Sequence, residues 1–257
     1  MSPPRSINPH AQSYARAADA YERGRPEYPA AAVAYAVALL GIGPHSTVLD
    51  LAAGTGKFTR QLLFTGARIL AVEPVAAMRE RIAAQLPSVN VLEGTAEAIP
   101  LPDESVDAVT VAQAFHWFRG RDALAEIRRV LKSGGGLALI WNVRDETVDW
   151  VRRLSELMDP HNGGAPRYHT GLWREAFSVP NGLTTLTVER FPFAHPSTPE
   201  QVVDRAASTS FVAGLPLERR AGLLDEVRHM LREHPETRGR ETIPFPYVTE
   251  VYGCRKA

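Results

Sequence analysis

Residues 48–59 read Val-Leu-Asp-Leu-Ala-Ala-Gly-Thr-Gly-Lys-Phe-Thr, an apolar run followed by small residues and then a helical pattern. We expect a strand that ends near Asp50, a tight turn through Gly54 and Gly56, and a helix that begins near Lys57. Small residues let a backbone approach a ligand closely, and a helix N-terminus presents unpaired N–H groups to it. The stretch therefore predicts a nucleotide-type binding turn, with a plain helix-capping turn as the alternative.

Two common nucleotide-binding motifs fit this turn poorly. A phosphate-binding P-loop needs Gly, four residues and then Gly-Lys-Ser/Thr, but Leu51 holds the first position and Phe58 the last. The dinucleotide fingerprint needs a third glycine where Thr59 stands. A nicotinamide-dependent oxidoreductase is therefore a weaker alternative.

A second acidic residue follows the turn at a distance typical of nucleoside sites. Residues 67–72 run apolar as a buried strand does, and Glu73-Pro74 ends that strand because proline cannot continue the ladder. A carboxylate at the tip of a second parallel strand can accept both ribose hydroxyls of a nucleoside. Asp50 and Glu73 together predict a site for a nucleoside.

The rest of the chain alternates strand and helix patterns. Strands are expected at 47–51, 67–72, 89–92, 106–111 and 136–142, and helices near 9–40 (broken at 25–29), 57–65, 75–86 and 121–131. Such alternation predicts an α/β fold with a parallel sheet covered on both faces. Beyond Trp141, helices are expected within 148–180 and 199–232, and strands at 184–191 and 243–254. We expect residues 145–182 and 195–240 either to cover the substrate at the carboxyl edge of the sheet or only to support the sheet.

Composition narrows the class of protein. The chain has 257 residues, 44% of them apolar and 23% charged, and no net charge, which suits one globular domain and gives no broad basic face for nucleic acid. A single cysteine excludes an internal disulfide, and the longest apolar run is too short to span a bilayer. We expect a soluble, cytoplasmic protein with no membrane partner. The scattered histidines lack ligand spacing and predict no metal; they are His161, His169, His195, His229 and His234.

Further motifs follow in a characteristic order. After residues 48–56 and Glu73-Pro74 come Glu-Gly-Thr-Ala-Glu-Ala-Ile-Pro (93–100), Val-Asp-Ala-Val (106–109) and Arg-Arg-Val-Leu-Lys-Ser-Gly-Gly (128–135). The ordered set resembles the class I S-adenosylmethionine-dependent methyltransferases, in the domain often called type 11, over about residues 40–145. Residues 14–29 are similar to the lead-in of a subgroup that resembles trans-aconitate methyltransferases.

The resemblance implies a particular fold. It implies a Rossmann-like three-layer sandwich whose seven-stranded, mostly parallel sheet has an antiparallel last strand. The whole chain is then one methyltransferase domain. It comprises an N-terminal helical lid (1–40), a cofactor-binding core (41–145), and a region of substrate-side helices and final strands (146–257).

It also implies S-adenosylmethionine as the cofactor and gives each motif a role. This cofactor carries no phosphate, so its site needs a ribose carboxylate and apolar adenine walls in place of a basic cluster. Carried over by position, the cofactor-binding residues are Asp50 near the methionine amine, Ala52, Gly54 and Gly56 beneath the cofactor, Glu73 and Pro74 at the ribose, Met78, Thr95, Ala96 and Glu97 around the adenine, and Gln113 at the methyl-transfer face. Taken by itself, Met78 is more readily interpreted as core than as an adenine wall.

Two positions depart from the family pattern. Ala52 replaces the first motif glycine, which tightens the turn. Thr95 stands where many relatives carry Asp, so that either its hydroxyl or Glu97 must meet the adenine amine.

Methyl transfer is an in-line displacement that depends mainly on alignment, desolvation and, where needed, proton removal. His116 is the candidate catalytic base, because its ordinary pKa lies near neutrality; alternatively it orients substrate or caps a short helix. Trp117 lines the same face or packs as core.

The N-terminal segment is expected to form a second wall of the substrate site. Its aromatic faces attract a sulfonium and its arginine suits a carboxylate; the residues are Tyr14, Tyr21, Arg25 and Tyr28. Alternatively, this segment only packs on the sheet. The leading hypothesis is methyl transfer to a small molecule, at a carboxylate or hydroxyl oxygen. A protein or nucleic-acid acceptor and a non-catalytic nucleoside-binding protein remain alternatives, and the oligomeric state is left open.

Overall fold

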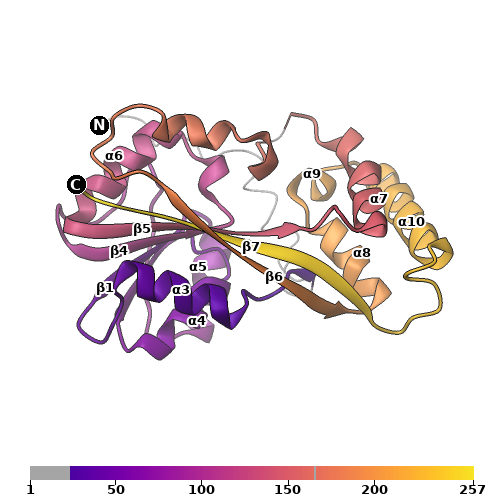
Figure 1. Cartoon of the computed structure of the whole chain (residues 1–257), viewed down its shortest axis with the longest axis horizontal. Helices are drawn as coiled ribbons and strands as arrows, with labels where there is room; N and C mark the ends of the chain where they lie inside the picture. Colours follow the sequence, from indigo (N-terminus) through magenta and orange to yellow (C-terminus); the bar gives the residue numbers. More distant parts are fainter. Residues whose placement is uncertain (1–23, 165) are drawn as a thin grey trace.

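The computed structural model describes residues 24–164 and 166–257, which are built around a seven-stranded sheet of order β3-β2-β1-β4-β5-β7-β6 (Figure 1). The strands are β1 Thr47–Leu51, β2 Arg68–Val72, β3 Asn90–Leu92, β4 Val106–Ala112, β5 Leu131–Arg144, β6 Thr187–Ser197 and β7 Ile243–Arg255. The first five strands pair in parallel, and β7 runs antiparallel to both β5 and β6. The predicted α/β class and the antiparallel last strand are confirmed.

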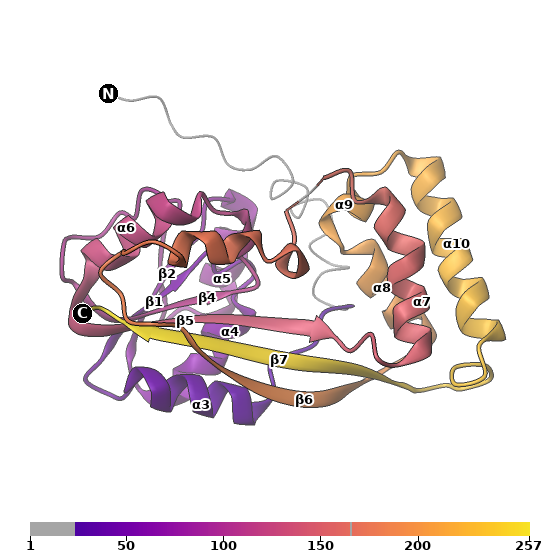
Figure 2. The ribbon, with the colours of Figure 1, turned by 45° about the horizontal axis from the view of Figure 1, so that its top comes forward.

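Helices cover both faces of this sheet, which makes three layers (Figure 2). One face carries α3 Ala30–Leu40, α4 Lys57–Leu62 and α5 Ala76–Gln85, whose apolar side chains share a core cluster with the sheet. The other face carries α6 Gly120–Val130 and the 3₁₀ segments η3 Phe115–Trp117 and η6 Leu172–Phe177. Both faces of the parallel strands are therefore buried, as their near-continuous apolar sequences predict.

A second group of helices sits beyond the carboxyl edge of the parallel strands (Figure 2). It comprises α7 Asp149–Met158, α8 Pro199–Ala207, α9 Ser210–Ala213 and α10 Leu217–Glu233. These helices share their own core with the far ends of β6 and β7, where Trp150, Phe245 and Tyr247 are buried. We call this group the helical cluster. It lies where ligands bind in open α/β sheets.

Several boundaries differ from the sequence expectation. The strand β5 extends to Arg144 because its second half pairs with β7, from Gly136 opposite Arg255 to Arg144 opposite Tyr247. The expected helix 199–232 is divided into α8, α9 and α10. The strand β6 begins at residue 187 and tolerates two prolines because it lies at the edge of the sheet. The division into lid, core and insertions stays a prediction.

Candidate active site

The turn after β1 adopts the backbone conformation that a close approach to a ligand requires. Ala52, Gly54 and Gly56 have φ of 57°, 59° and 83°, all in the left-handed region. A Cβ added to Gly54 would meet nothing within 4 Å, so that open space adjoins the turn. A Cβ on Gly56 would approach Leu86 Cδ1 at 3.1 Å, so that the leucine side chain would have to shift by a few tenths of an ångström. Ala52 adopts a conformation that favours glycine.

Asp50 supports this turn from within the protein. Its side chain is buried, with Oδ2 accepting from Thr59 Oγ1 at 2.5 Å and Oδ1 from Thr110 Oγ1 at 2.9 Å. Burial raises the pKa of Asp50 to about 6, although both threonine hydrogen bonds oppose the rise. The carboxylate thus joins β1, α4 and β4 beneath the turn, and its contact with the methionine amine stays a prediction.

Glu73 closes the turn from the tip of β2. Its Oε2 accepts from the Gly54 N–H and its Oε1 from the Val75 N–H, both at 2.9 Å. Burial raises the pKa of Glu73, and these N–H groups together with the Arg79 guanidinium oppose the rise. Arg79 also donates to the carbonyl oxygens of Glu73 and Pro74, at 3.0 and 2.8 Å. The carboxylate stands at the strand tip where a ribose is expected, and that contact stays a prediction.

The predicted adenine side contains a polar atom without a partner. The hydroxyl oxygen of Thr95 is buried and makes no hydrogen bond to the described part of the chain. Glu97 is engaged elsewhere, because its Oε1 accepts from the Arg119 N–H at 2.9 Å. Met78 and Ala96 are buried and apolar, as an adenine wall requires. An unpaired buried hydroxyl fits the predicted adenine amine, because such groups are rarely left unsatisfied.

At the tip of β4, Gln113 and His116 face the neighbouring strand β5. Gln113 has a φ of 60° and donates its Nε2 hydrogen to the Asn142 carbonyl oxygen at 3.4 Å. His116 Nδ1 accepts from the Trp141 indole N–H at 3.3 Å, so the neutral ring carries its hydrogen on Nε2. Burial, followed by the positive charges of Arg25, His169 and Arg167, lowers the pKa of His116 to about 3. This favours the substrate-orienting interpretation of His116 over the general base.

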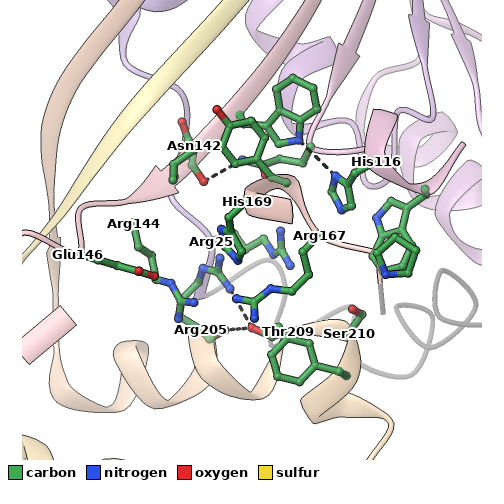
Figure 3. Close-up of a pocket in the computed structure, with 17 residues that line it drawn as sticks. Arg25, His116, Asn142, Arg144, Glu146, Arg167, His169, Arg205, Thr209 and Ser210 are labelled. Atoms are coloured by element: carbon green, nitrogen blue, oxygen red, sulfur yellow. Dashed lines mark hydrogen bonds between the residues drawn. The ribbon is translucent and has the colours of Figure 1, made fainter. Parts of the chain in front are cut away.

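A cavity of about 100 Å³ opens between this tip and the helical cluster (Figure 3). It brings together four of the predicted site residues, Arg25, Gln113, His116 and Trp117. Three arginines that the sequence analysis did not single out also line it: Arg144, Arg167 and Arg205. They come from the end of β5, the loop before η5 Tyr168–Thr170, and α8, and Figure 3 shows their guanidinium groups converging with that of Arg25.

Positive charge exceeds negative charge around this cavity. Glu146 is its only acidic lining residue among those described, and Asp159 pairs with Arg167 at 2.6 Å from outside the lining. Burial lowers the pKa of Arg205 to about 10, so that this side chain stays charged at neutral pH, and burial also lowers the pKa of Arg144. The cavity is therefore suited to an anion.

Of the remaining predicted wall residues, Tyr28 lies apart from the cavity. Its side chain is buried, and its ring packs edge-on against Phe58 with centroids 5.1 Å apart. It lines a narrower hollow with Arg25, Gln113 and Lys57. Tyr14 and Tyr21 lie outside the described residues, so the lid prediction is untested at those positions.

Residues 25–28, which we call the strap, are hydrogen-bonded to α4. This helix follows the turn after β1 at residues 52–56, which we call the cofactor turn. Lys57 Nζ donates to the Arg25 carbonyl oxygen at 2.8 Å. Gln61 donates to the Tyr28 carbonyl oxygen at 2.8 Å and accepts from the Tyr28 N–H at 3.2 Å. On the other side, the Asn142 amide donates to the Glu27 carbonyl oxygen at 3.3 Å. The strap thus fixes Arg25 between the cofactor turn and the cavity.

Within 24–164 and 166–257, no three His, Cys, Asp or Glu side chains are grouped as ligands of a metal ion. In the same ranges no helix has the length and apolar character needed to cross a membrane. The absence of a metal stays an expectation.

The fold, the turn and the two strand-tip carboxylates define the class I S-adenosylmethionine-dependent methyltransferases, and comparison with known proteins agrees. A family model for a methyltransferase domain matches residues 49–139. The chain is 40% identical over 237 residues to an uncharacterised methyltransferase of Mycobacterium tuberculosis, covering 92% of this chain and 93% of that one. The chain belongs to this methyltransferase family and uses S-adenosylmethionine.

Solved structures share the fold. A protein from Anaeromyxobacter dehalogenans, provisionally assigned as a type II methyltransferase, is 26% identical with a TM-score of 0.65, covering 90% of this chain and 96% of that one. A geranyl diphosphate methyltransferase solved in complex with S-adenosylmethionine is 17% identical with a TM-score of 0.50, covering 89% and 85%. The narrower resemblance to trans-aconitate methyltransferases is not confirmed by these relatives.

Proposed function

We propose that this methyltransferase methylates a carboxylate oxygen of a small anionic molecule held in the arginine-lined cavity. The observation that carries the proposal is the convergence of Arg25, Arg144, Arg167 and Arg205 beside Gln113 and His116. Arginine presents a planar fork of donors that matches a carboxylate. A cavity of about 100 Å³ suits a small metabolite better than a polymer.

The scarcity of bases favours a carboxylate over a hydroxyl acceptor. A hydroxyl must lose a proton during transfer, whereas a carboxylate is already ionised at neutral pH. His116 has a pKa of about 3 and its Nδ1 already accepts from Trp141, while burial lowers the pKa of His169. The carboxylate of Glu146 accepts from Ser155 Oγ at 2.6 Å.

The chemistry of the cofactor fits such an acceptor. Bound S-adenosylmethionine supplies a methyl group on a positively charged sulfur, and the C–S bond breaks, leaving its electron pair on sulfur, as the acceptor oxygen bonds to carbon. The acceptor carboxylate becomes a neutral ester without gaining or losing a proton. The protein's part is to hold the carboxylate by its arginines and to donate from His116 Nε2, while Trp141 fixes the ring.

The test incubates the purified full-length protein with S-adenosylmethionine and a panel of small carboxylic acids and hydroxylated compounds. Formation of S-adenosylhomocysteine together with an alkali-labile product one methylene heavier is the expected result, since methyl esters hydrolyse in base. Arg25→Gln should lower turnover while binding of S-adenosylhomocysteine is kept, and Arg232→Gln, an exposed position on α10, is the matched control. An alkali-stable product, formed from a hydroxyl compound, contradicts the proposal.

A further inference from the structure

We propose that the acceptor carries a second anionic group, which Arg144 and Arg205 hold and which is not methylated. The inference rests on the proposed function and deepens it, because it defines the charge of the acceptor. Two observations support it: the hydrogen-bond partners of these two arginines are few and weak, and the two side chains lie together in the cavity.

Arg144 is the last residue of β5, and its guanidinium has only a weak partner. Its Nη1 donates to the thioether sulfur of Met158 at 3.3 Å, and a thioether is a poor acceptor. No carboxylate of the described residues lies within 4.0 Å of its nitrogens, although its side chain is partly buried. A charge held in this way is stabilised by an incoming anion.

Arg205 reaches the same place from α8. Its Nη1 donates to the Thr209 hydroxyl at 3.2 Å, while its Nε is buried and has no partner in the described part of the chain. The Tyr247 ring lies beside it, and the charges of Arg25 and Arg144 act together with burial to lower its pKa. Two guanidinium groups from different elements are thus placed together although like charges repel. An anion bound between them removes that repulsion.

The converging arginines and His116 reach the cavity from different sides. Figure 3 shows Arg144 and Arg205 on the side of the helical cluster, and His116 on the side of the β4 tip where methyl transfer is expected. One carboxylate near Arg25 and His116, together with Glu146, still leaves one positive charge of the Arg144–Arg205 pair without a counter-charge. Because Arg167 is already offset by Asp159, a second anion is the group that completes the charge balance.

A second anion also gives the product a distinct fate. The esterified group loses its charge on methylation, whereas the group at Arg144 and Arg205 keeps its own. The product is then bound through one anionic contact in place of two, so it dissociates more readily than the substrate. A carboxylate and a phosphate share the required chemistry, and the experiment separates them.

The test measures binding of three small probes to the full-length protein saturated with S-adenosylhomocysteine, by calorimetry at constant ionic strength. Glycolate carries one carboxylate, malonate two, and phosphoglycolate a carboxylate and a phosphate; we call malonate and phosphoglycolate the dianions after their two anionic groups. We expect at least one of the two dianions to bind about tenfold more tightly than glycolate, the size of one charged hydrogen bond. Whichever dianion binds more tightly identifies the second group.

Variants locate the effect. Arg144→Gln and Arg205→Gln should each weaken dianion binding more than glycolate binding, which reduces the preference for the dianion to less than about twofold, whereas Arg205→Lys should restore part of that preference. Arg232→Gln removes the same charge from the exposed face of α10 and serves as the control. Unchanged affinity for S-adenosylhomocysteine shows that each variant is folded. If one of the two variants does not fold, the other still tests the inference.

Three outcomes overturn the inference: equal binding of glycolate and both dianions, a loss of glycolate and dianion affinity in equal measure, or the same effect in Arg232→Gln. Methylation of a monocarboxylate with no preference for dianions contradicts the second anionic group and leaves the proposed function supported. Tight dianion binding without methylation of any carboxylate contradicts the proposed function and leaves the second anionic group supported.

Discussion

Replacing Asp50 with asparagine should stabilise the folded protein above neutral pH. The carboxylate is buried and its pKa is raised to about 6 from an ordinary 3.8, so that ionisation is less favourable in the folded than in the unfolded state. The unfolded chain therefore binds fewer protons than the folded chain between these two values. Stability from this group is complete below about pH 4 and is lost as pH rises through about 6.

The size of the effect follows from the shift. About two pKa units correspond to roughly 3 kcal/mol of destabilisation once Asp50 is ionised. Asparagine keeps the acceptor for Thr59 but donates toward Thr110, whose hydroxyl can then turn to the Leu49 carbonyl oxygen 3.5 Å away. That weaker bond costs about 1 kcal/mol, which leaves a net gain of about 2 kcal/mol near pH 8.

The assay is urea unfolding of the wild type and Asp50→Asn in steps between about pH 4 and pH 8. We expect the difference in unfolding free energy to grow with pH up to about 6.5 and then to level off. Glu93→Gln, an exposed carboxylate on the same side of the sheet, is the control and should show no such growth. A variant less stable than wild type at pH 8, or a difference independent of pH, refutes the reasoning.

Three other outcomes can be measured. Ala52→Gly should raise the unfolding free energy by about 0.5–1 kcal/mol, because φ at this position is 57°; a loss of stability in urea unfolding contradicts the strain argument. Thr95→Val should weaken S-adenosylhomocysteine about fivefold in calorimetry, roughly one hydrogen bond, without lowering stability; unchanged affinity removes Thr95 from the adenine site. Because the pKa of His116 is about 3, the pH–rate profiles of the wild type and His116→Asn should not differ by an inflection between about pH 6 and 8. An inflection in the wild type that is lost in the variant would support His116 as the general base.

The sheet could be predicted from the sequence because buried parallel strands leave a strong local pattern. The apolar runs before Asp50 and Glu73 ended where the strands end, with the turn and proline signals in place. The strand β5 was expected at 136–142 but runs from Leu131 to Arg144. At its start, Leu131 pairs with Val106 of β4 before a register shift, and its last two residues pair with β7, which lies about a hundred residues later. Long-range pairing of this kind leaves no local period.

The turn after β1 could be predicted from the sequence, whereas three of the arginines that line the cavity were missed. The turn lies within the ordered motifs and Gln113 and His116 follow the motif at 106–109, but Arg144, Arg167 and Arg205 come from three unrelated segments in an arginine-rich chain. One signal was available for Arg144, since it directly follows an apolar strand at the edge where ligands bind. His116 suited a base by residue type, yet burial and the surrounding arginines lower its pKa, and only the folded arrangement reveals both.

The continuous ladder of β5, β7 and β6 has a mechanical consequence. These strands run unbroken from the core into the helical cluster, with β7 paired over nine positions to β5 and over eleven to β6. Arg144, at the end of β5, is therefore held in the same hydrogen-bonded sheet as the strands beside the turn after β1. Moving Arg144 away from that turn would require breaking main-chain hydrogen bonds. An acceptor with two anionic groups, as proposed above, would therefore have to fit a fixed distance between Arg144 and the turn after β1.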